Sequence, residues 1–391
     1  MRDTSDGARH EATDAGHGRW EPPWRWGRRN NDPEYAWLGA GRAVDAALRE
    51  SGGGRVAGVR VAGGQGRPFY AVQFIRGDWL CTASVDALTG DVASIVHDGD
   101  AAPARMSPPV VTDRRRLTLP HRVIGDIQAS VDDPSLAYVA TDAGVSTVRM
   151  EHDGLRLVAE RVTGFGSTRQ IAAVPGGVAG ITGDGRAFML HDRPVTGLHA
   201  WVTRLPASPY TIASAAQRVL IASDAGAVEL DLADGRVVRI LDGTPVRAAT
   251  YLRPGKAVLA THSGWLSVVN TVDGTPEWCY EQGEYPDRMW SAHDRILLAG
   301  EGGLKEVVPG EGVVCRWSTP LRDAVASAAS VCGQVFTCTP GAPLAAHSYA
   351  TAAHDGPLDT HPDVITTVRT PGGRSALLAA YRDGTIEALE L

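Results

Sequence analysis

The stretch VLATHSGWLSVVNTVDGTPEWCY runs from Val258 to Tyr280. It begins with two segments of alternating apolar side chains, typical of half-buried strands, on either side of a turn at Ser263-Gly264. A second turn at Asp273-Gly274 leads into a further strand that carries Trp278. The same pattern occurs seven times between residue 120 and the C-terminus, and it therefore decides the fold.

A turn glycine marks each of the seven repeats, at intervals of 38 to 43 residues. These glycines are Gly144, Gly185, Gly226, Gly264, Gly303, Gly341 and Gly384. An apolar strand precedes each one, and the period-two alternation excludes a solenoid built from pairs of helices. A period near 40 residues with about four short strands is typical of a β-propeller blade. The sequence therefore predicts a mainly β protein whose main part is a seven-bladed β-propeller.

The propeller is expected to cover residues 110–391 and to be closed by a strand from its N-terminal end. The seventh repeat ends at Leu391, after only its third strand. A spare strand with alternating side chains, residues 116–119, lies just ahead of the first repeat. Pairing of strand 116–119 with the C-terminal blade would complete that blade and remove two exposed strand edges.

Residues 32–100 are predicted to form a small α+β domain, which a Pro/Ala linker at 101–109 joins to the propeller. Asp32-Pro33 provides an N-cap and a first helical residue, and the helix is expected to end at Gly52-Gly53-Gly54. An antiparallel meander should follow the helix. Its expected strands are 55–62, 69–76, 79–86 and 91–96.

The end of this domain reads V-D-A-L-T-G-D-V, from Val85 to Val92. The order of one helix and a meander, with a V-D-x-x-T-G-x-V hairpin, resembles the PepSY family of small bacterial domains. The resemblance implies a regulatory or inhibitory role for residues 32–100.

Residues 1–31 are polar, small and glycine-rich, and they predict a disordered or loosely docked tail. Within the tail, residues 19–29 read RWEPPWRWGRR, in which three tryptophans alternate with arginine and proline. One interpretation is an aromatic and basic patch that touches nucleic acid or a membrane surface. The other is that the tryptophans dock on the neighbouring folded domain.

Three tryptophans follow second-turn glycines by four or five residues: Trp201, Trp278 and Trp317. The segments that start at Thr196-Gly197 and Asp273-Gly274 look like the T-G-x-x-x-W docking motif of quinoprotein-type propellers. That resemblance implies that each tryptophan packs between neighbouring blades. WD-repeat propellers share the blade length, although their G-H and W-D dipeptides do not recur here.

Composition narrows the classes of function. The formal net charge of -7 makes nucleic acid an unlikely partner. Five scattered cysteines without a C-x-x-C spacing favour buried thiols in a reducing compartment. No apolar signal segment begins the sequence and no run of 18 apolar residues occurs, so we expect a cytoplasmic protein without a membrane span.

Catalytic and cofactor motifs are not visible in the sequence. No segment matches a P-loop, a G-x-S-x-G elbow, H-E-x-x-H or an EF-hand loop. The sequence also shows no ligand set for a quinone. We therefore expect no metal and no cofactor.

Side chains that could bind a ligand gather in the connections between blades, which line the mouth of a propeller channel. The predicted ligand-binding residues are Arg122, Arg169, Tyr210, Arg247, Arg288, Trp290, Arg322 and Asp323. Such a ring could hold a polar or anionic small molecule or a peptide. The alternative is that these side chains pair with one another around a wet channel. His361, with Asp363 or Asp126, is the candidate for acid–base catalysis.

Two function classes follow from these residues, and the fold does not decide between them. The first is a non-catalytic binding module that engages a protein, a peptide or a polar metabolite at the channel mouth. The alternative is an enzyme, such as a lyase, cyclase or hydrolase, that acts on a small polar or anionic substrate there. A third reading is a scaffold that binds partners on its blade edges.

Overall fold

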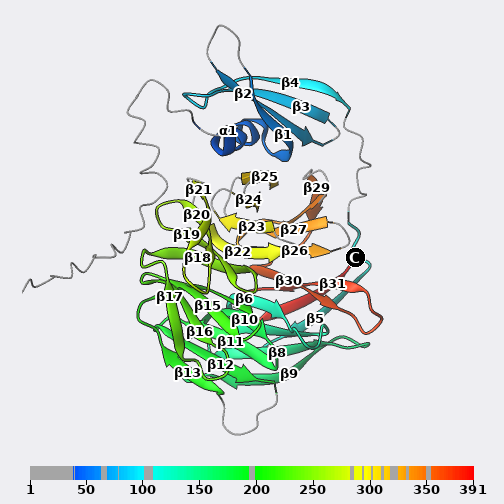
Figure 1. Cartoon of the computed structure of the whole chain (residues 1–391). Helices are drawn as coiled ribbons and strands as arrows, with labels where there is room; N and C mark the ends of the chain where they lie inside the picture. The colour runs from blue at the N-terminus through cyan, green and yellow to red at the C-terminus, as the bar shows by residue number, and fades with distance from the viewer. Residues whose placement is uncertain are drawn as a thin grey trace, which may run out of the picture. The chain divides into compact units, whose positions relative to one another are not determined.

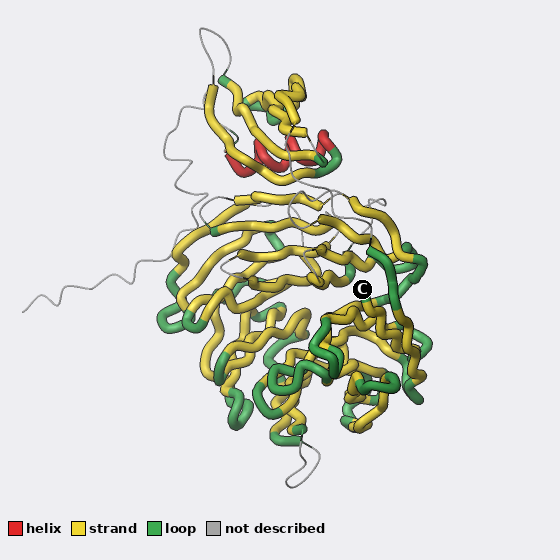
Figure 2. The backbone as a smooth tube through the Cα atoms, turned by 90° about the vertical axis from the view of Figure 1, so that its right-hand side faces the viewer, coloured by secondary structure: helices red, strands yellow, loops and turns green. Residues whose placement is uncertain are grey.

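The computed structural model describes residues 38, 40–62, 68–77, 79–100, 109–192, 199–281, 286–292, 295–300, 303–309, 312–317, 325–331, 334–348 and 354–391. Leu38–Leu391 form one compact unit. Within the described ranges the chain has one helix and 32 strands (Figure 2). No helix in these ranges is long and apolar enough to cross a membrane. The predicted tail at 1–31 and almost all of the linker at 101–109 lie outside them.

Among the described residues, the strands from β5 onward form seven antiparallel sheets, numbered I to VII in chain order (Figure 1). Sheets I to IV are β6–β9 (Val123–Ala129, Leu136–Thr141, Gly144–Met150, Leu155–Val162), β10–β13 (Thr168–Val174, Gly177–Thr182, Arg186–His191, Trp201–Arg204), β14–β17 (Pro209–Ala215, Arg218–Ser223, Gly226–Asp231, Val237–Leu241) and β18–β21 (Val246–Arg253, Lys256–Thr261, Trp265–Asn270, Pro276–Glu281). Sheets V to VII are β22–β25 (Pro286–Ala292, Arg295–Gly300, Gly303–Val308, Gly312–Trp317), β26–β29 (Ser327–Val331, Gln334–Cys338, Leu344–Ser348, His354–Leu358) and β30–β32 with β5 (Val364–Arg369, Ser375–Ala380, Thr385–Glu390, Asp113–Thr118).

The sheets follow one another around a common centre. The first strand of each sheet lies towards the middle and the fourth lies at the periphery (Figure 1). Along the chain β6 contacts β10, β10 contacts β14, β14 contacts β18 and β18 contacts β22, and β30 contacts both β26 and β6. Sheets V and VI meet through a buried cluster that includes Trp317 and Val325. This repeated four-stranded architecture agrees with the predicted β-propeller.

The local sequence explains the regular sheets. The second strands β7 and β11 are buried at all six positions, since neighbouring sheets cover both of their faces. A glycine lies in the turn between the second and third strands of every sheet. Its φ is between +77° and +108° in six of the seven repeats, Gly144 being the exception. Only glycine adopts such a conformation without strain, so these positions keep the turn between the second and third strands tight.

Strand β5 completes sheet VII by pairing antiparallel with β32, from Asp113 opposite Glu390 to Thr118 opposite Thr385. It begins three residues earlier than the expected strand at 116–119. The Arg115 guanidinium reaches sheet I, where its Nη1 donates to the carbonyl oxygens of Glu151 at 2.8 Å and His152 at 2.9 Å. This one side chain therefore ties the first sheet of the ring to the last.

The N-terminal segment consists of α1 (Ala40–Ser51) and the meander β1 (Gly54–Ala62), β2 (Phe69–Arg76), β3 (Trp79–Asp86) and β4 (Val92–Asp100). Strands β2 and β3 have the expected limits. The expected helix start at Asp32 lies outside the described residues. The prediction of one helix that runs from Asp32 through Leu38 is wrong. Leu38 is not helical, because its N–H donates to the carbonyl oxygen of Ala87 at 2.6 Å.

The meander is joined to sheet V by backbone pairing, which the sequence analysis did not predict. Strand β1 pairs antiparallel with β25, with Gly54 opposite Arg316 and Arg55 opposite Cys315. The result is a single sheet of eight strands. Helix α1 packs its apolar face in the same buried cluster as residues of sheets IV and V, and the Tyr280 hydroxyl donates to Asp45 at 3.0 Å.

The predicted docking tryptophans contact neighbouring sheets. Trp201 is buried among residues of sheets II and III, and its Nε1–H donates to the carbonyl oxygen of Leu232 at 2.7 Å. Trp317 is buried between sheets V and VI. Trp278 is half-buried and stacks on Tyr280 of its own strand, with the two ring planes 2° apart. It packs against the buried cluster that contains residues of α1 and of sheets IV and V. Each indole therefore lies where one sheet meets another part of the fold.

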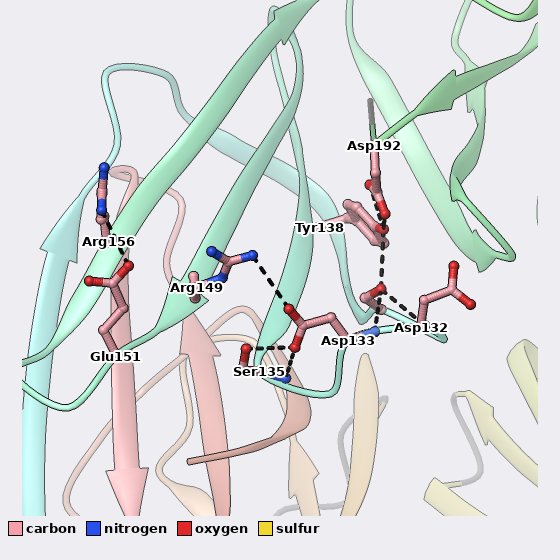
Figure 3. Close-up of polar contacts among 9 residues, drawn as sticks. Asp132, Asp133, Ser135, Tyr138, Arg149, Glu151, Arg156 and Asp192 are labelled. Carbon is pink, nitrogen blue, oxygen red and sulfur yellow. Dashed lines mark hydrogen bonds and ion pairs between the residues drawn. The ribbon is translucent and has the colours of Figure 1, made fainter. Parts of the chain in front are cut away.

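A buried phenol joins sheets I and II (Figure 3). Tyr138 on β7 is fully buried, and its hydroxyl donates to the carboxylate of Asp192 at 2.8 and 2.9 Å. Burial raises the pKa of the Tyr138 phenol above its usual value. From β9, Arg161 Nη2 donates to the Asp192 carbonyl oxygen at 2.8 Å. These contacts fix the end of β12 against sheet I.

Three third strands carry a buried glutamate three residues after the turn glycine: Glu229, Glu306 and Glu387. Each forms an ion pair with an arginine of its own sheet. Two of them also accept a tyrosine hydroxyl, from Tyr251 at 2.9 Å and from Tyr381 at 2.7 Å. The partners satisfy carboxylates that would otherwise be costly to bury.

Arg115→Ala should lower the free energy of unfolding by about 1–3 kcal/mol, because two carbonyl oxygens of sheet I lose their donor. Arg156→Ala is the matched control, because Arg156 is 70% exposed and has one ion pair, at 3.5 Å to Glu151. It should change the stability by less than about 0.5 kcal/mol. Urea titration of both variants measures this, and equal losses would contradict the closing role of Arg115.

Gly235→Ala should destabilise the chain more than Gly274→Ala. Both glycines have positive φ, of +69° and +75°, so both substitutions carry a backbone cost of about 1–2 kcal/mol. A Cβ at residue 235 would lie 2.5 Å from the Trp201 ring, whereas residue 274 has nothing within 4 Å. The clash should add about 1–3 kcal/mol, measured by urea titration. Equal effects would show that Trp201 is not held against this turn.

Candidate functional site

A pocket of about 500 Å³ lies where the first strands of the sheets begin. Its wall includes the first residues of β6, β10, β14, β18, β22 and β30, and we call it the mouth pocket. The charged and aromatic side chains of the wall are Arg169, Tyr210, Arg247, Asp287, Arg288, Asp363 and Arg382. These residues come from five different sheets or their turns, so only the closed ring assembles them.

Four of the predicted ligand-binding residues line the mouth pocket: Arg169, Tyr210, Arg247 and Arg288. Arg122 is exposed just before β6, outside the lining. Trp290 lies further along β22, in the wall of two inner cavities of about 320 and 170 Å³. Arg322 and Asp323 lie outside the described residues.

The three candidate catalytic residues do not come together in any of the three described cavities. Asp363 lines the mouth pocket, and Asp126 lines the two inner cavities. His361 is exposed and belongs to the wall of none of these three spaces. The three described cavities therefore give no support to acid–base catalysis by these residues. In the described ranges no three metal-ligating side chains come together either.

An ion pair spans the centre of the ring and forms the floor of the mouth pocket. Arg288 of sheet V donates from Nη1 to Asp126 Oδ1 of sheet I at 2.7 Å, and its Nη2 donates to the Gly125 carbonyl oxygen. Their side chains are 14% and 5% exposed. Arg288 lines all three cavities, so its side chain lies between the mouth pocket and the inner spaces.

Asp126 also belongs to a collar of hydrogen bonds between neighbouring first strands. In four places a polar side chain accepts the backbone N–H of the next first strand. These bonds are Ile171 N–H to Asp126 at 3.4 Å, Ile212 N–H to Gln170 at 3.3 Å, Ala249 N–H to Thr211 at 3.1 Å and Ile365 N–H to Ser327 at 3.0 Å. The collar was not predicted from the sequence. Its signal is a polar residue near the start of each of these first strands.

The collar changes at sheets IV and V. Ala248 and Arg288 occupy the positions that correspond to Gln170 and Thr211, each following the bulge at the start of its strand. An alanine side chain and a guanidinium cannot accept a hydrogen bond. Arg288 instead extends to the far side of the ring and binds Asp126.

Arg247 and Tyr210 form a second polar group in the mouth pocket. The Arg247 Cζ lies 5.1 Å from the centre of the Tyr210 ring, and its Nη2 donates to Asp287 at 2.7 Å. The Tyr210 hydroxyl donates to Asp224, and this hydrogen bond raises the pKa of the phenol, with burial adding to it. His262 lies beside the same ring, at 5.2 Å between centres.

The remaining charges of the mouth pocket differ in how they are paired. Arg382 binds Asp363 through its side chain at 3.2 Å, and its backbone N–H donates to the same carboxylate at 2.8 Å. Arg169 is exposed, and within the described part of the chain no hydrogen bond or ion pair engages its guanidinium. Among the charged side chains of this wall, Arg169 can therefore bind a ligand without first breaking an ion pair with a described residue.

No protein-family model and no curated protein sequence matches the chain. Solved structures do resemble it. The Cps50 (Swd1) β-propeller domain of Myceliophteria thermophila has a TM-score of 0.59 at 11% identity, and the match covers 72% of this chain and 99% of that one. A chain of a mitotic checkpoint complex has a TM-score of 0.56 at 12% identity, covering 74% and 98%. The Pan2 WD40 domain of Neurospora crassa has a TM-score of 0.55 at 13% identity, covering 73% and 97%.

These similarities establish the fold and nothing further, because the identities are low. The main part of the chain is a β-propeller whose structural neighbours include WD40 domains.

The Arg288–Asp126 pair should show strong coupling in a double-mutant cycle. Asp126→Asn or Arg288→Met alone leaves a buried charge without its partner and should cost about 3–5 kcal/mol. The double variant should lose clearly less than the sum of the two single losses. Unfolding free energies from urea titration test this, and additivity within about 0.5 kcal/mol would contradict the coupling.

Proposed function

We propose that this chain is a seven-bladed β-propeller that acts as a non-catalytic binding module and takes a segment of a partner protein into the mouth pocket. The seven sheets and the pairing of β5 with β32 support the blade count. On this proposal the propeller domain covers residues 110–391. We group the propeller with the quinoprotein-like propellers because three tryptophans, Trp201, Trp278 and Trp317, pack where sheets meet.

The mouth pocket is the observation that carries this proposal. It concentrates four arginines and a tyrosine, side chains that interfaces favour, at one opening of about 500 Å³. One of the similar solved chains belongs to a mitotic checkpoint complex, so this fold occurs within an assembly. The enzyme alternative has no comparable support, because His361 lies outside the mouth pocket.

The N-terminal segment is proposed to be a PepSY-like domain at residues 32–100. Its hairpin supports this, because the Asp86 carboxylate accepts the N–H groups of Leu88 at 2.8 Å and Thr89 at 2.9 Å. Such a turn explains the V-D-x-x-T-G pattern in physical terms. The pairing of β1 with β25 supports a domain that extends the propeller and does not act alone.

The double variant Arg169→Glu/Arg247→Glu should lose partner binding, because two cations of the pocket wall become anions. The control Arg156→Glu/Arg236→Glu makes the same change of net charge at two side chains that are each 70% exposed and lie outside the mouth pocket. Affinity capture from extracts of the source organism, quantified by mass spectrometry, compares both with the wild-type chain.

We expect the mouth variant to capture the specific partner at least about tenfold less than the control, which corresponds to about 1.4 kcal/mol. Melting curves check that both variants are folded. Equal capture by the two variants would place the partner elsewhere and refute the proposal.

A further inference from the structure

The charge of the mouth pocket is distributed unevenly around its wall. Arg169, Arg247 and Arg288 come from sheets II, IV and V, and we call them the cationic arc. The opposite side, from sheets VI, VII and I, presents mainly small apolar side chains. We call these the apolar wall: Ile124, Ala326, Pro340 and Val364. The charged residues on that side, Asp363 and Arg382, are paired with each other. A ligand that is anionic on one side and apolar on the other therefore suits the pocket.

The lining residues carry an excess of positive charge. Four arginines line the pocket, against the carboxylates of Asp287 and Asp363. With the deeper Asp126 counted, three of the arginines are in ion pairs and Arg169 is left over. The chain as a whole has a formal net charge of -7, so the charge of the pocket wall is opposite in sign to that of the whole chain. Such a local reversal steers anionic partners towards the site.

Arg247 can bind a ligand together with Arg169 without any change in the buried part of the structure. Its ion pair with Asp287 is open to solvent, with side chains 36% and 43% exposed. Exposed pairs of this kind contribute little to stability and exchange partners readily. Its contact with the Tyr210 ring restricts the guanidinium, which lowers the entropy lost when a ligand binds.

The apolar wall offers a contact for a neighbouring side chain of the ligand. Ile124 is 41% exposed at the start of β6, and Pro340 is exposed in the turn after β27. Aliphatic side chains of an extended peptide point alternately to opposite sides. A peptide that points one residue at the cationic arc can therefore place an adjacent one on the apolar wall.

We infer that the mouth pocket binds an extended segment of a partner protein in which an aspartate or glutamate lies next to an apolar residue. This inference rests on the function proposed above and names its ligand. The carboxylate binds Arg169 and Arg247, and the apolar side chain packs on Ile124 and Pro340. Arg288 remains bound to Asp126 as the floor.

A carboxylate fits this pocket better than a phosphate group. A carboxylate has one negative charge, which matches Arg169, the one guanidinium of the wall without an ion pair among the described residues. A phosphoserine carries about -1.5 to -2 charges at pH 7. It would need the full charge of a second cation: Arg288 is buried in its pair with Asp126, and drawing Arg247 away from Asp287 would leave that carboxylate unpaired beside the phosphate.

The test is a selection of displayed random twelve-residue peptides on the folded full-length chain. The peptides are fused through their C-terminus, so that only side chains supply carboxylates. We expect the recovered peptides to be enriched in aspartate or glutamate next to an apolar residue. We also expect their binding to be lost on the Arg169→Glu/Arg247→Glu variant and kept on Arg156→Glu/Arg236→Glu.

A double-mutant cycle then identifies the contact. Arg169→Gln in the chain, or the acid-to-amide change in a synthetic copy of the best peptide, should each weaken binding about tenfold, or about 1.4 kcal/mol. Both changes together should cost little more than one, because they remove the same ion pair. Fluorescence anisotropy at two salt concentrations measures these affinities.

The possible outcomes separate this inference from the proposed function. Neutral peptides that still depend on the mouth arginines would overturn the acidic ligand and leave the binding function in place. Recovery of no peptide that depends on these arginines would count against both. A phosphoserine copy of the best peptide that binds more than about tenfold tighter than the acidic one would replace the carboxylate by a phosphate.

Discussion

The first strand of each sheet has no strand of its own sheet on its inner side, and the N–H groups on that side need acceptors. Four of these groups are satisfied by a side chain of the preceding sheet, from Asp126, Gln170, Thr211 and Ser327. The same requirement holds the ring together, because each such bond joins two sheets that share no backbone ladder. The remaining architecture depends on this collar.

The candidate site is a consequence of the same constraint. Where the collar has Arg288 in place of an acceptor, the side chain crosses to Asp126 and lies between the mouth pocket and the two inner cavities. The pocket therefore has a rigid floor and a wall of side chains from strand beginnings, where the chain turns inward from the periphery. Charged residues at these positions stay accessible, so binding does not require the core to open.

Much of the fold was predictable from local signals. The turn glycines marked each sheet because only they tolerate positive φ, and the limits of β2 and β3 followed from alternation between turns. The contact of Trp201 with the next sheet was likewise visible as a spacing from a glycine. The pairing of β1 with β25 was not, since an exposed strand edge carries no mark of the partner that will cover it.

The site was predictable only in part, for a geometric reason. Four residues of the mouth pocket were predicted from the sequence because they lie at connections between blades, which meet at one end of the ring: Arg169, Tyr210, Arg247 and Arg288. The partner of Arg288 is 162 residues away in the sequence, so it becomes visible only when the ring is closed. His361 shows the converse, since it lies two residues from Asp363 and yet is not part of the wall of the mouth pocket.

Site-specific photocrosslinking tests most directly whether partners meet this protein at the mouth pocket or on the outer strands. A photoreactive amino acid would replace Ile124 in one variant and Val202, on the outer strand β13, in another. These two side chains have nearly equal exposure, 41% and 40%, and differ in place. The account predicts a crosslinked partner protein from position 124 and none from position 202. A partner crosslinked from position 202 alone would contradict it.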